Sequence, residues 1–236
     1  MTQTLQDKRV LIVGGARGIG FSVGKAAAFR GATVIVGASD FASALAAASD
    51  ISDATPVEID ISCEESIATA LDQVVCVDHV VVSPLADDDS GPGYKKLDMA
   101  FDARVAALTR LARHAAKYLP PDGSIALCSG GEAWSSTQGQ SNMAAGDAAA
   151  FLAGRLATAF APIRVNAVSP SSAISGSLSA FKAEQDRESR HNAAHGPRHG
   201  RTLANDDIVK AVLWLMGASF VNGVTIHVDG GARFAA

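Results

Sequence analysis

Short runs of apolar residues, rich in Val and Ile, alternate along the chain with longer stretches rich in Ala. The apolar runs are continuous rather than interrupted at every second position, which is typical of strands covered on both faces. They predict seven strands, at residues 9–13, 33–36, 55–59, 79–82, 124–127, 163–168 and 224–228. The intervening stretches predict helices at residues 18–30, about 40–49, 64–74, about 98–118, about 139–160 and 206–216. This order predicts an α/β fold with a single domain over residues 1–236, a doubly wound (Rossmann-type) parallel sheet of about seven strands with helices on both faces.

One segment departs from this regular pattern. Residues 171–201 are rich in Ser, His, Arg and Gly and poor in apolar residues. Because the segment follows a predicted strand, it should lie at the carboxyl edge of the sheet, where doubly wound folds bind ligands. We interpret it as a substrate lid, with an inert surface loop as the alternative. The segment contains three histidines, any of which could donate a proton: His191, His195 and His199. The Gly-Pro pair at 196–197 prevents one helix from aligning all three, so we predict no metal site.

Composition and charge narrow the classes of function. Hydrophobic residues make up 48% of the chain and charged residues 19%, which is enough apolar surface for a folded core. The 20 Lys and Arg against 24 Asp and Glu give a formal net charge of -4, so we expect neither nucleic acid nor an anionic membrane as a partner. The longest uncharged run, residues 211–228, is interrupted by Gly, Asn and His and predicts no membrane span. Three cysteines without a C-x-x-C pair and a polar start of the chain lead us to expect a cytoplasmic protein.

The first predicted strand leads through a glycine-rich turn into a predicted helix. Glycine permits a tight turn and a close approach of the backbone to a phosphate, while a helix N-terminus offers free N–H groups and a partial positive charge. The turn therefore predicts a dinucleotide site, with a ligand-free strand-to-helix turn as the alternative. Its sequence is Gly14-Gly15-Ala16-Arg17-Gly18-Ile19-Gly20, which differs in spacing from the common G-x-G-x-x-G fingerprint.

This spacing resembles the T-G-x-x-x-G-x-G motif of the short-chain dehydrogenase/reductase family, with Val13 in the place of Thr. The resemblance continues over almost the whole chain, through Asp60-Ile61, the run IRVNAVSP at 163–170 and the run VDGG at 228–231. It implies an oxidoreductase of a small-molecule substrate that forms a homotetramer or homodimer through two long helices. The resemblance also implies which residues hold the cofactor. Asp60 and Ile61 would contact the adenine. The residues toward the nicotinamide would be Ser83, Pro84, Pro170, Ala173 and Ser175.

Charge at the end of the second strand indicates which dinucleotide binds. An NAD site places an acidic residue there, which bonds the ribose hydroxyls and repels a 2′-phosphate. In this chain Ala38 and Ser39 take that place. Arg17 could pair with a 2′-phosphate and Ser39 could donate a hydrogen bond to it, so we predict NADP as the cofactor. NAD is the alternative if Asp40 takes the acidic place, or if Arg17 is only a solvated turn residue.

The catalytic positions depart from the pattern of the family. Relatives carry a Ser, a Tyr and, one helical turn after the Tyr, a Lys; the tyrosine hydroxyl protonates the substrate oxygen. Ser129 takes the serine position, but the tyrosine position is Asn142 and the lysine position is Gly146. An asparagine amide can donate a hydrogen bond but delivers no proton. We therefore predict that Ser129 and Asn142 orient and polarise a substrate carbonyl.

These departures leave three hypotheses open. The first is an NADP(H)-dependent reductase in which water, a lid histidine or the substrate supplies the proton. The second is a non-catalytic dinucleotide-binding protein, a sensor or scaffold whose lid responds to the cofactor. The third is a different reaction, such as dehydration or cyclisation, on the same fold.

Overall fold

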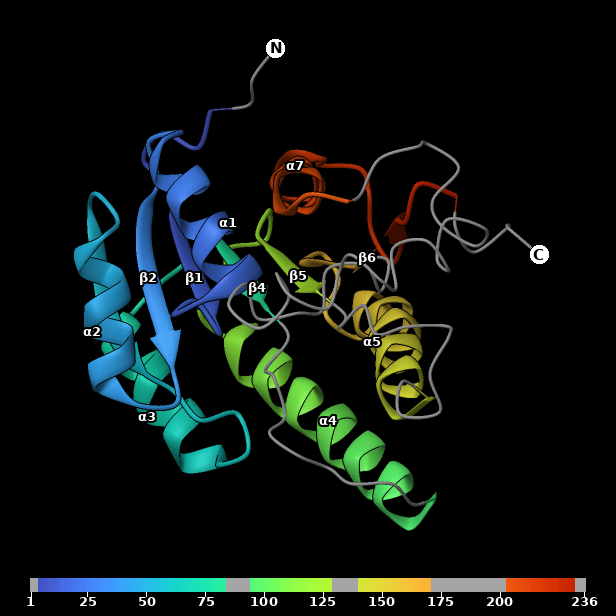
Figure 1. Ribbon diagram of the computed structural model, residues 1–236. Coiled ribbons are helices and arrows are strands. Elements are labelled where there is room, and N and C mark those ends of the chain that lie inside the picture. Colours follow the sequence, from blue (N-terminus) through green and yellow to red (C-terminus); the bar gives the residue numbers. More distant parts are fainter. Residues whose placement is uncertain (1–3, 84–93, 129–139, 171–202, 232–236) are drawn as a thin grey trace, which may run out of the picture.

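The structure is a computed structural model that describes residues 4–83, 94–128, 140–170 and 203–231, with the backbone alone for residues 94–104 and 140–149. The described chain forms one sheet flanked by helices (Figure 1). The strands are β1 (Arg9–Val13), β2 (Thr33–Ala38), β3 (Ala54–Glu58), β4 (His79–Val82), β5 (Ser124–Cys128), β6 (Arg164–Pro170) and β7 (Thr225–Val228). The helices are α1 (Gly18–Ala28), α2 (Phe41–Ser49), α3 (Glu64–Val74), α4 (Tyr94–Ala115), α5 (Gln140–Ala159) and α7 (Asn205–Gly217).

The seven strands pair in parallel in the order β3-β2-β1-β4-β5-β6-β7. The chain runs outward from β1 to β3 and then returns to β4 on the other side of β1, which is doubly wound topology. The predicted fold class is therefore confirmed. Three strands continue beyond their predicted ends: β2 to Ala38, which pairs with Glu58, β5 to Cys128, which pairs with Val168, and β6 to Pro170, which pairs with Val228.

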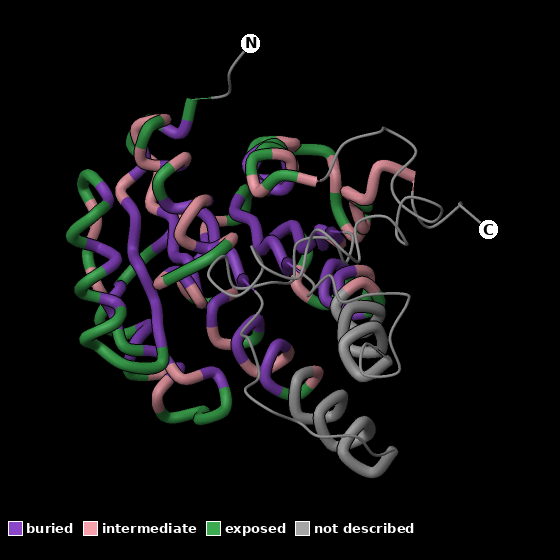
Figure 2. The backbone as a smooth tube through the Cα atoms, in the orientation of Figure 1, coloured by how far each residue is buried: buried purple, intermediate pink, exposed green. Residues whose placement is uncertain are grey.

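The strands supply apolar side chains to two cores, one on each face of the sheet. In β1, Leu11 and Val13 belong to the core that includes residues of α3, α4 and α5. Val10 and Ile12 belong to the core that includes residues of α1, α2 and α7. These four side chains are at most 1% exposed, and the burial extends through the central strands (Figure 2). Both faces of the sheet are covered, which is why its strand sequences are continuously apolar.

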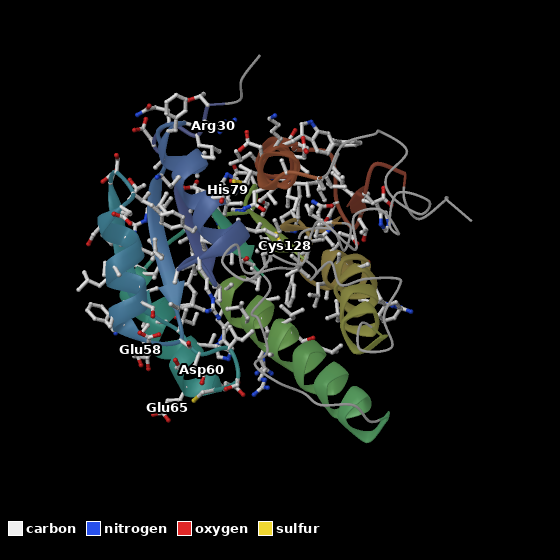
Figure 3. All side chains as sticks on the ribbon, in the orientation of Figure 1. Arg30, Glu58, Asp60, Glu65, His79 and Cys128 are labelled. Atoms are coloured by element: carbon white, nitrogen blue, oxygen red, sulfur yellow. The ribbon has the colours of Figure 1, made fainter. Side chains whose placement is uncertain are left out.

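A buried polar pair joins β4 and β5 at the amino edge of the sheet. His79 and Ser124 are register partners, 6% and 2% exposed, and His79 Nδ1 lies 2.8 Å from Ser124 Oγ. Figure 3 shows His79 at the end of the sheet opposite to Asp60. Burial lowers the pKa of His79 to about 4, against the opposing charge of Asp78. The imidazole is therefore neutral in the folded protein near pH 7.

Arg164, at the start of β6, holds the end of α7 against the sheet. Its side chain is 6% exposed, and its guanidinium donates to three carbonyl oxygens: Leu215 at 2.8 Å, Met216 at 2.6 Å and Ala218 at 3.1 Å. Carbonyl groups in the last turn of a helix have no partners within the helix. A cation is also favoured there by the helix dipole, so this one side chain satisfies both requirements.

We expect His79 to make the protein less stable as the pH falls from about 6.5 to about 4. In this range the imidazole binds a proton in the unfolded chain but stays neutral in the folded protein, so proton uptake favours unfolding. The lost free energy of unfolding should approach about 3 kcal/mol below pH 4. Urea unfolding across this range should show a shallower pH dependence for His79→Asn than for the parent. Equal slopes would mean that the folded protein does not keep this imidazole neutral.

Arg164→Met should lower the free energy of unfolding by about 3 kcal/mol, because it leaves three carbonyl groups at a buried helix end without a donor. Arg164→Lys should cost less, since an ammonium keeps the charge and reaches some of the carbonyls. Lys210→Met is the matched control, because Lys210 is an exposed residue of the same helix. The measurement is denaturant unfolding of the three variants. A cost for Arg164→Met no larger than that for Lys210→Met would contradict the anchoring role.

Candidate functional site

The candidate site lies at the carboxyl edge of the sheet, at the point where strand order reverses. β2 pairs with one side of β1 and β4 pairs with the other. In open α/β sheets ligands bind in the crevice at this reversal. The described residues bring four segments to this edge: the β1–α1 turn at 14–17, the β2–α2 turn at 39–40, the β3–α3 turn at 59–63, and Ser83 after β4 (Figure 1).

Backbone hydrogen bonds fix the turn after β1 to the neighbouring strand β2. The N–H groups of Gly14 and Gly15 both donate to the carbonyl of Gly37, at 3.0 and 2.9 Å. Gly14 has φ 79° and Gly18 has φ 60°, in the left-handed region that strains other L residues. The sequence therefore has glycine where the backbone of the turn requires it.

Gly20 brings α1 into direct contact with the turn and with the end of β4. A Cβ atom at this position would lie 2.2 Å from the carbonyl oxygen of Gly14 and 3.0 Å from Cβ of Ser83. Ser83 is 3% exposed, and its N–H donates to the carbonyl of Val13 at 2.9 Å. The ends of β1 and β4 and the start of α1 thus meet at one point, where only a hydrogen atom fits.

The N-terminus of α1 has no side-chain cap. The helix follows Arg17, whose side chain makes no capping hydrogen bond, and its first turn contains no acidic residue. The first N–H groups of a helix lack partners within the helix, and the helix dipole adds positive charge there. Arg17 is exposed at this N-terminus, and Ser39 is exposed directly after β2. Backbone and side chains together provide donors suited to phosphate.

Asp40 has a structural role at the start of α2. Its Oδ1 accepts a hydrogen bond from the N–H of Ser43 at 2.8 Å, which makes Asp40 the N-cap of the helix. That backbone hydrogen bond lowers the pKa of Asp40, which keeps the cap ionised. This capping hydrogen bond explains why an aspartate stands at this position, and no bound ligand is needed to explain it. The last residue of β2, Ala38, is 6% exposed and contributes no polar side chain.

The turn between β3 and α3 shapes the surroundings of Asp60. Its Oδ1 accepts hydrogen bonds from the N–H of Ser62 at 2.8 Å and from the hydroxyl of Ser62 at 2.7 Å. The N–H of Asp60 donates to Ser66 Oγ at 2.9 Å. The two bonds to the carboxylate use one oxygen, so Oδ2 takes no part in them. Ile61 is 8% exposed with its side chain in the core, so only its backbone can meet a ligand.

The part of the site expected to bind the nicotinamide and the substrate is described only in part. The predicted lid at 171–201, with its histidines, Ala173 and Ser175, lies outside the described residues, as do the predicted positions Pro84 and Ser129. Asn142 and Gly146 lie in α5, where the backbone alone is described. Pro170 is the buried last residue of β6. The catalytic assignments therefore stay predictions.

Cys128, next to the predicted serine position, is a core residue. It is 7% exposed and packs in the core that includes residues of α1, α2 and α7. Burial raises the pKa of its thiol to about 12, so the thiol stays protonated and is a poor nucleophile. In the described part of the chain, no cluster of three or more His, Cys, Asp or Glu could hold a metal ion. Nor does any helix there have the length and apolar character needed to cross a membrane.

Three residues that shape this edge were missed in the sequence: Gly37, Ser62 and Ser66. A serine two positions after an aspartate at a strand end is a common Asx-turn pattern, and this signal could have identified Ser62. No comparable signal marks Gly37 or Ser66. The role of Gly37 depends on its carbonyl reaching the N–H groups of a different strand's turn, which only the sheet register reveals.

A separate groove lies between α1 and α7. It has a volume of about 420 Å³, and Lys25, Phe29, Arg30 and Lys210 are among the residues that line it. None of its lining residues belongs to the turns at the carboxyl edge. We therefore do not assign it to the candidate site.

Comparisons with known proteins agree with this architecture. A family model described as enoyl-(acyl carrier protein) reductase matches residues 14–233. The short-chain dehydrogenase/reductase ucsE of Acremonium sp is 30% identical, over 98% of this chain and 97% of that protein. The cis-4-hydroxycyclohexanecarboxylate dehydrogenase of Sinomonas cyclohexanicum is 28% identical, over 98% of each chain. The crystal structure of a dehydrogenase/reductase from Sinorhizobium meliloti 1021 superimposes with a TM-score of 0.80 at 26% identity, over 98% of this chain and 96% of that one.

The family match covers almost the whole chain. It includes the glycine turn, the turn that carries Asp60, and the end of β6. Members of this family bind nicotinamide dinucleotides. The chain therefore belongs to the short-chain dehydrogenase/reductase family of oxidoreductases.

Proposed function

We propose that the protein binds NADP(H) and reduces a small carbonyl compound, with a non-standard group in place of the family's tyrosine acid. The observation that carries the proposal is the uncapped N-terminus of α1 at the carboxyl edge of the sheet. A helix N-terminus with unpartnered N–H groups, no acidic residue in its first turn and an exposed arginine beside it fits a pyrophosphate. The residues present at this edge therefore fit a dinucleotide.

Each part of the dinucleotide has candidate partners in the chain. The backbone N–H groups at the start of α1, around Gly18, Ile19 and Gly20, would hold the pyrophosphate. Asp60, through Oδ2, and the backbone of Ile61 would hold the adenine. The family resemblance assigns the nicotinamide end to Ser83, Pro84, Pro170, Ala173 and Ser175.

The preference for NADP over NAD rests on the end of β2. Ala38 stands where an NAD site has its acid, and Asp40 serves as the N-cap of α2. The acidic side chain that would bond the ribose hydroxyls and repel a 2′-phosphate is therefore missing from the last position of β2. Arg17 and Ser39 are exposed donors on the two turns that flank this place, and an arginine fork suits a phosphate.

The residues proposed at the reacting end are hydrogen-bond donors without a strong acid. Bound NADPH would supply a hydride to the substrate carbonyl, so negative charge develops on the carbonyl oxygen. We assign the stabilisation of that charge to the hydroxyl of Ser129 and the amide of Asn142. Neither group is a good proton donor, so the proton comes from water, from a lid histidine or from the substrate itself.

A second candidate function is a non-catalytic dinucleotide-binding protein. The sequence feature that favours it is the replacement of both Tyr and Lys by Asn142 and Gly146. General acid catalysis typically contributes about 10² to 10⁴-fold to a rate, and that contribution is lost with the tyrosine. Binding of the cofactor at the same site would then change how the protein interacts with a partner.

We also propose a homotetramer or homodimer built on α4 and α5, as the family resemblance implies. Phe151 of α5 is 63% exposed, and the guanidinium of Arg155 lies 5.1 Å from its ring. A single exposed aromatic side chain is normal on a protein surface, so the proposal rests on the family resemblance.

Titration with NADPH and NADH, followed by cofactor fluorescence, tests the proposed cofactor. We expect the parent to bind NADPH more tightly than NADH. Arg17→Ala should weaken NADPH binding by about 10- to 100-fold, because it removes charge-assisted hydrogen bonds to the 2′-phosphate, and should leave NADH binding nearly unchanged. Lys210→Ala is the control for loss of a surface charge. Absence of binding by the parent up to millimolar concentrations of either cofactor would contradict the proposal.

Restoring the missing pair separates the two candidate functions. Asn142→Tyr combined with Gly146→Lys should raise turnover of small carbonyl substrates by about 10² to 10⁴-fold over the parent, since it returns the acid and the cation beside it. Gly146→Lys alone should strengthen NADPH binding without this gain in rate. The measurement is NADPH oxidation with a panel of aldehydes and ketones. A gain over an inactive parent would show that the pocket of a non-catalytic protein still fits a carbonyl substrate. A double variant that binds NADPH but reduces none of them would argue for a site rebuilt for a different reaction and contradict the proposed reduction.

A further inference from the structure

Helix α4, far along the chain, contacts the turn that carries Asp60. Nη1 of Arg110 donates to the carbonyl of Ser62 at 3.2 Å. Nε of Arg110 also donates to the carbonyl of Ala106 at 3.2 Å, which fixes the guanidinium against its own helix. Ser62 is the residue whose N–H and hydroxyl both donate to Asp60 Oδ1. A continuous series of contacts therefore runs from Arg110 through Ser62 to the Asp60 carboxylate.

A second contact joins α4 to the same turn just downstream. Glu64 begins α3, and its Oε1 lies 2.5 Å from Nη2 of Arg113 and 2.9 Å from Nε2 of His114. The hydrogen bond with His114 lowers the pKa of Glu64, with a further contribution from the charge of Arg113. These contacts hold the start of α3 beside α4. They leave Arg110 as the described α4 side chain that contacts the turn itself.

The base of the turn is anchored by Ile59 and Ile61, whose side chains are buried in the core, and by the N–H of Ile59, which donates to the carbonyl of Ala38 at 2.7 Å. The exposed end of the turn, Ser62 and Cys63, has no such anchor. Apart from the contact with Arg110, the described bonds of these two residues are local, such as the bond from the N–H of Cys63 to the carbonyl of Asp60 at 3.2 Å. Local bonds fix the shape of this exposed end but do not join it to another element of the fold. The contact with Arg110 connects the turn to a helix that packs on the core.

We propose that Arg110 is a positioning residue for the adenosine half of the cofactor. By holding the Ser62 carbonyl it keeps Ser62 in place as the double donor to Oδ1, which fixes the direction in which Oδ2 of Asp60 can accept from the adenine amino group. This inference rests on the proposed function, because it takes the Asp60 turn as the adenine site. Arg110 touches no reacting atom, so its loss acts on cofactor affinity through the turn.

The test compares Arg110→Gln and Arg110→Lys with the parent. The ligands are NADPH, followed by fluorescence, and adenosine 2′,5′-bisphosphate, followed by calorimetry. Arg110→Gln should raise both Kd values by about 10-fold, the lower end of what one hydrogen bond from a charged donor contributes, because this bond is exposed. The two fold-changes should be equal, because the effect lies entirely in the adenosine half. The midpoint of thermal unfolding without ligand should stay within about 2 °C of the parent.

Two comparisons separate positioning from simple attraction between charges. Lys117→Gln removes an exposed positive charge just beyond the end of α4 and should leave both Kd values unchanged. Arg110→Lys keeps the charge but loses the planar fork, so it should also weaken binding, to a smaller extent than Arg110→Gln. Parent-like affinity in Arg110→Lys, or an equal loss in Lys117→Gln, would reduce the effect to charge and overturn the inference.

Ser62→Ala provides an independent variant if Arg110→Gln fails to fold. It removes the hydroxyl donor to Asp60 Oδ1 and leaves the carbonyl that Arg110 contacts, so it should weaken both ligands in the same direction. A parent that binds neither ligand would contradict the proposed function, and this inference with it. A parent that binds NADPH, together with an Arg110→Gln variant that binds it equally well, would overturn this inference alone.

Discussion

The close contact between Gly20 and Gly14 determines how the carboxyl edge of the sheet is built. A Cβ at Gly20 would lie 2.2 Å from the Gly14 carbonyl oxygen, so α1 can begin this near to β1 only with glycine at that position. Gly20 also lies against Ser83 at the end of β4, and the N–H of Ser83 donates to the carbonyl of Val13. Because Arg17 does not cap the helix, the first N–H groups of α1 are left at the sheet edge for an anion. A packing constraint between two glycines thus places the N-terminus of α1 at the edge where we propose that the phosphates bind.

The two edges of the sheet are held together by different kinds of contact. At the amino edge, buried side chains make the connections, through the pair His79 and Ser124 and through Arg164 at the end of α7. At the carboxyl edge, the turn after β1 is fixed by backbone bonds to the Gly37 carbonyl. Backbone bonds leave side chains free to meet a ligand, whereas a buried imidazole or guanidinium depends on fixed partners. Stability and binding are therefore divided between opposite ends of the strands.

The sequence predicts those features that depend on local pattern. Continuous apolar runs predicted seven strands because both faces of the sheet are buried, and the glycine turn was predicted because its backbone geometry restricts residue type. Strand ends were less accurate: β2 was predicted to stop before Gly37, a weak strand former, yet pairing with β3 continues it to Ala38. Arg110 was not predicted at all, since its contact with Ser62 joins distant parts of the chain. Long-range contacts of this kind follow from the packing of α4 beside α3.

Residues without a folding role give the strongest argument about function. Gly20 is required by packing and Asp60 shapes its own turn, so their presence would be expected in a scaffold that binds nothing. Arg17 and Ser39 are exposed, and Arg17 leaves the helix uncapped, which favours a ligand at this place. Gly146 points the same way at the reacting end, because glycine inside a helix costs about 1 kcal/mol relative to alanine. The exposed donors of the two turns and a costly glycine in α5 are residues that folding alone does not require, so they carry more of the functional argument than Gly20 or Asp60.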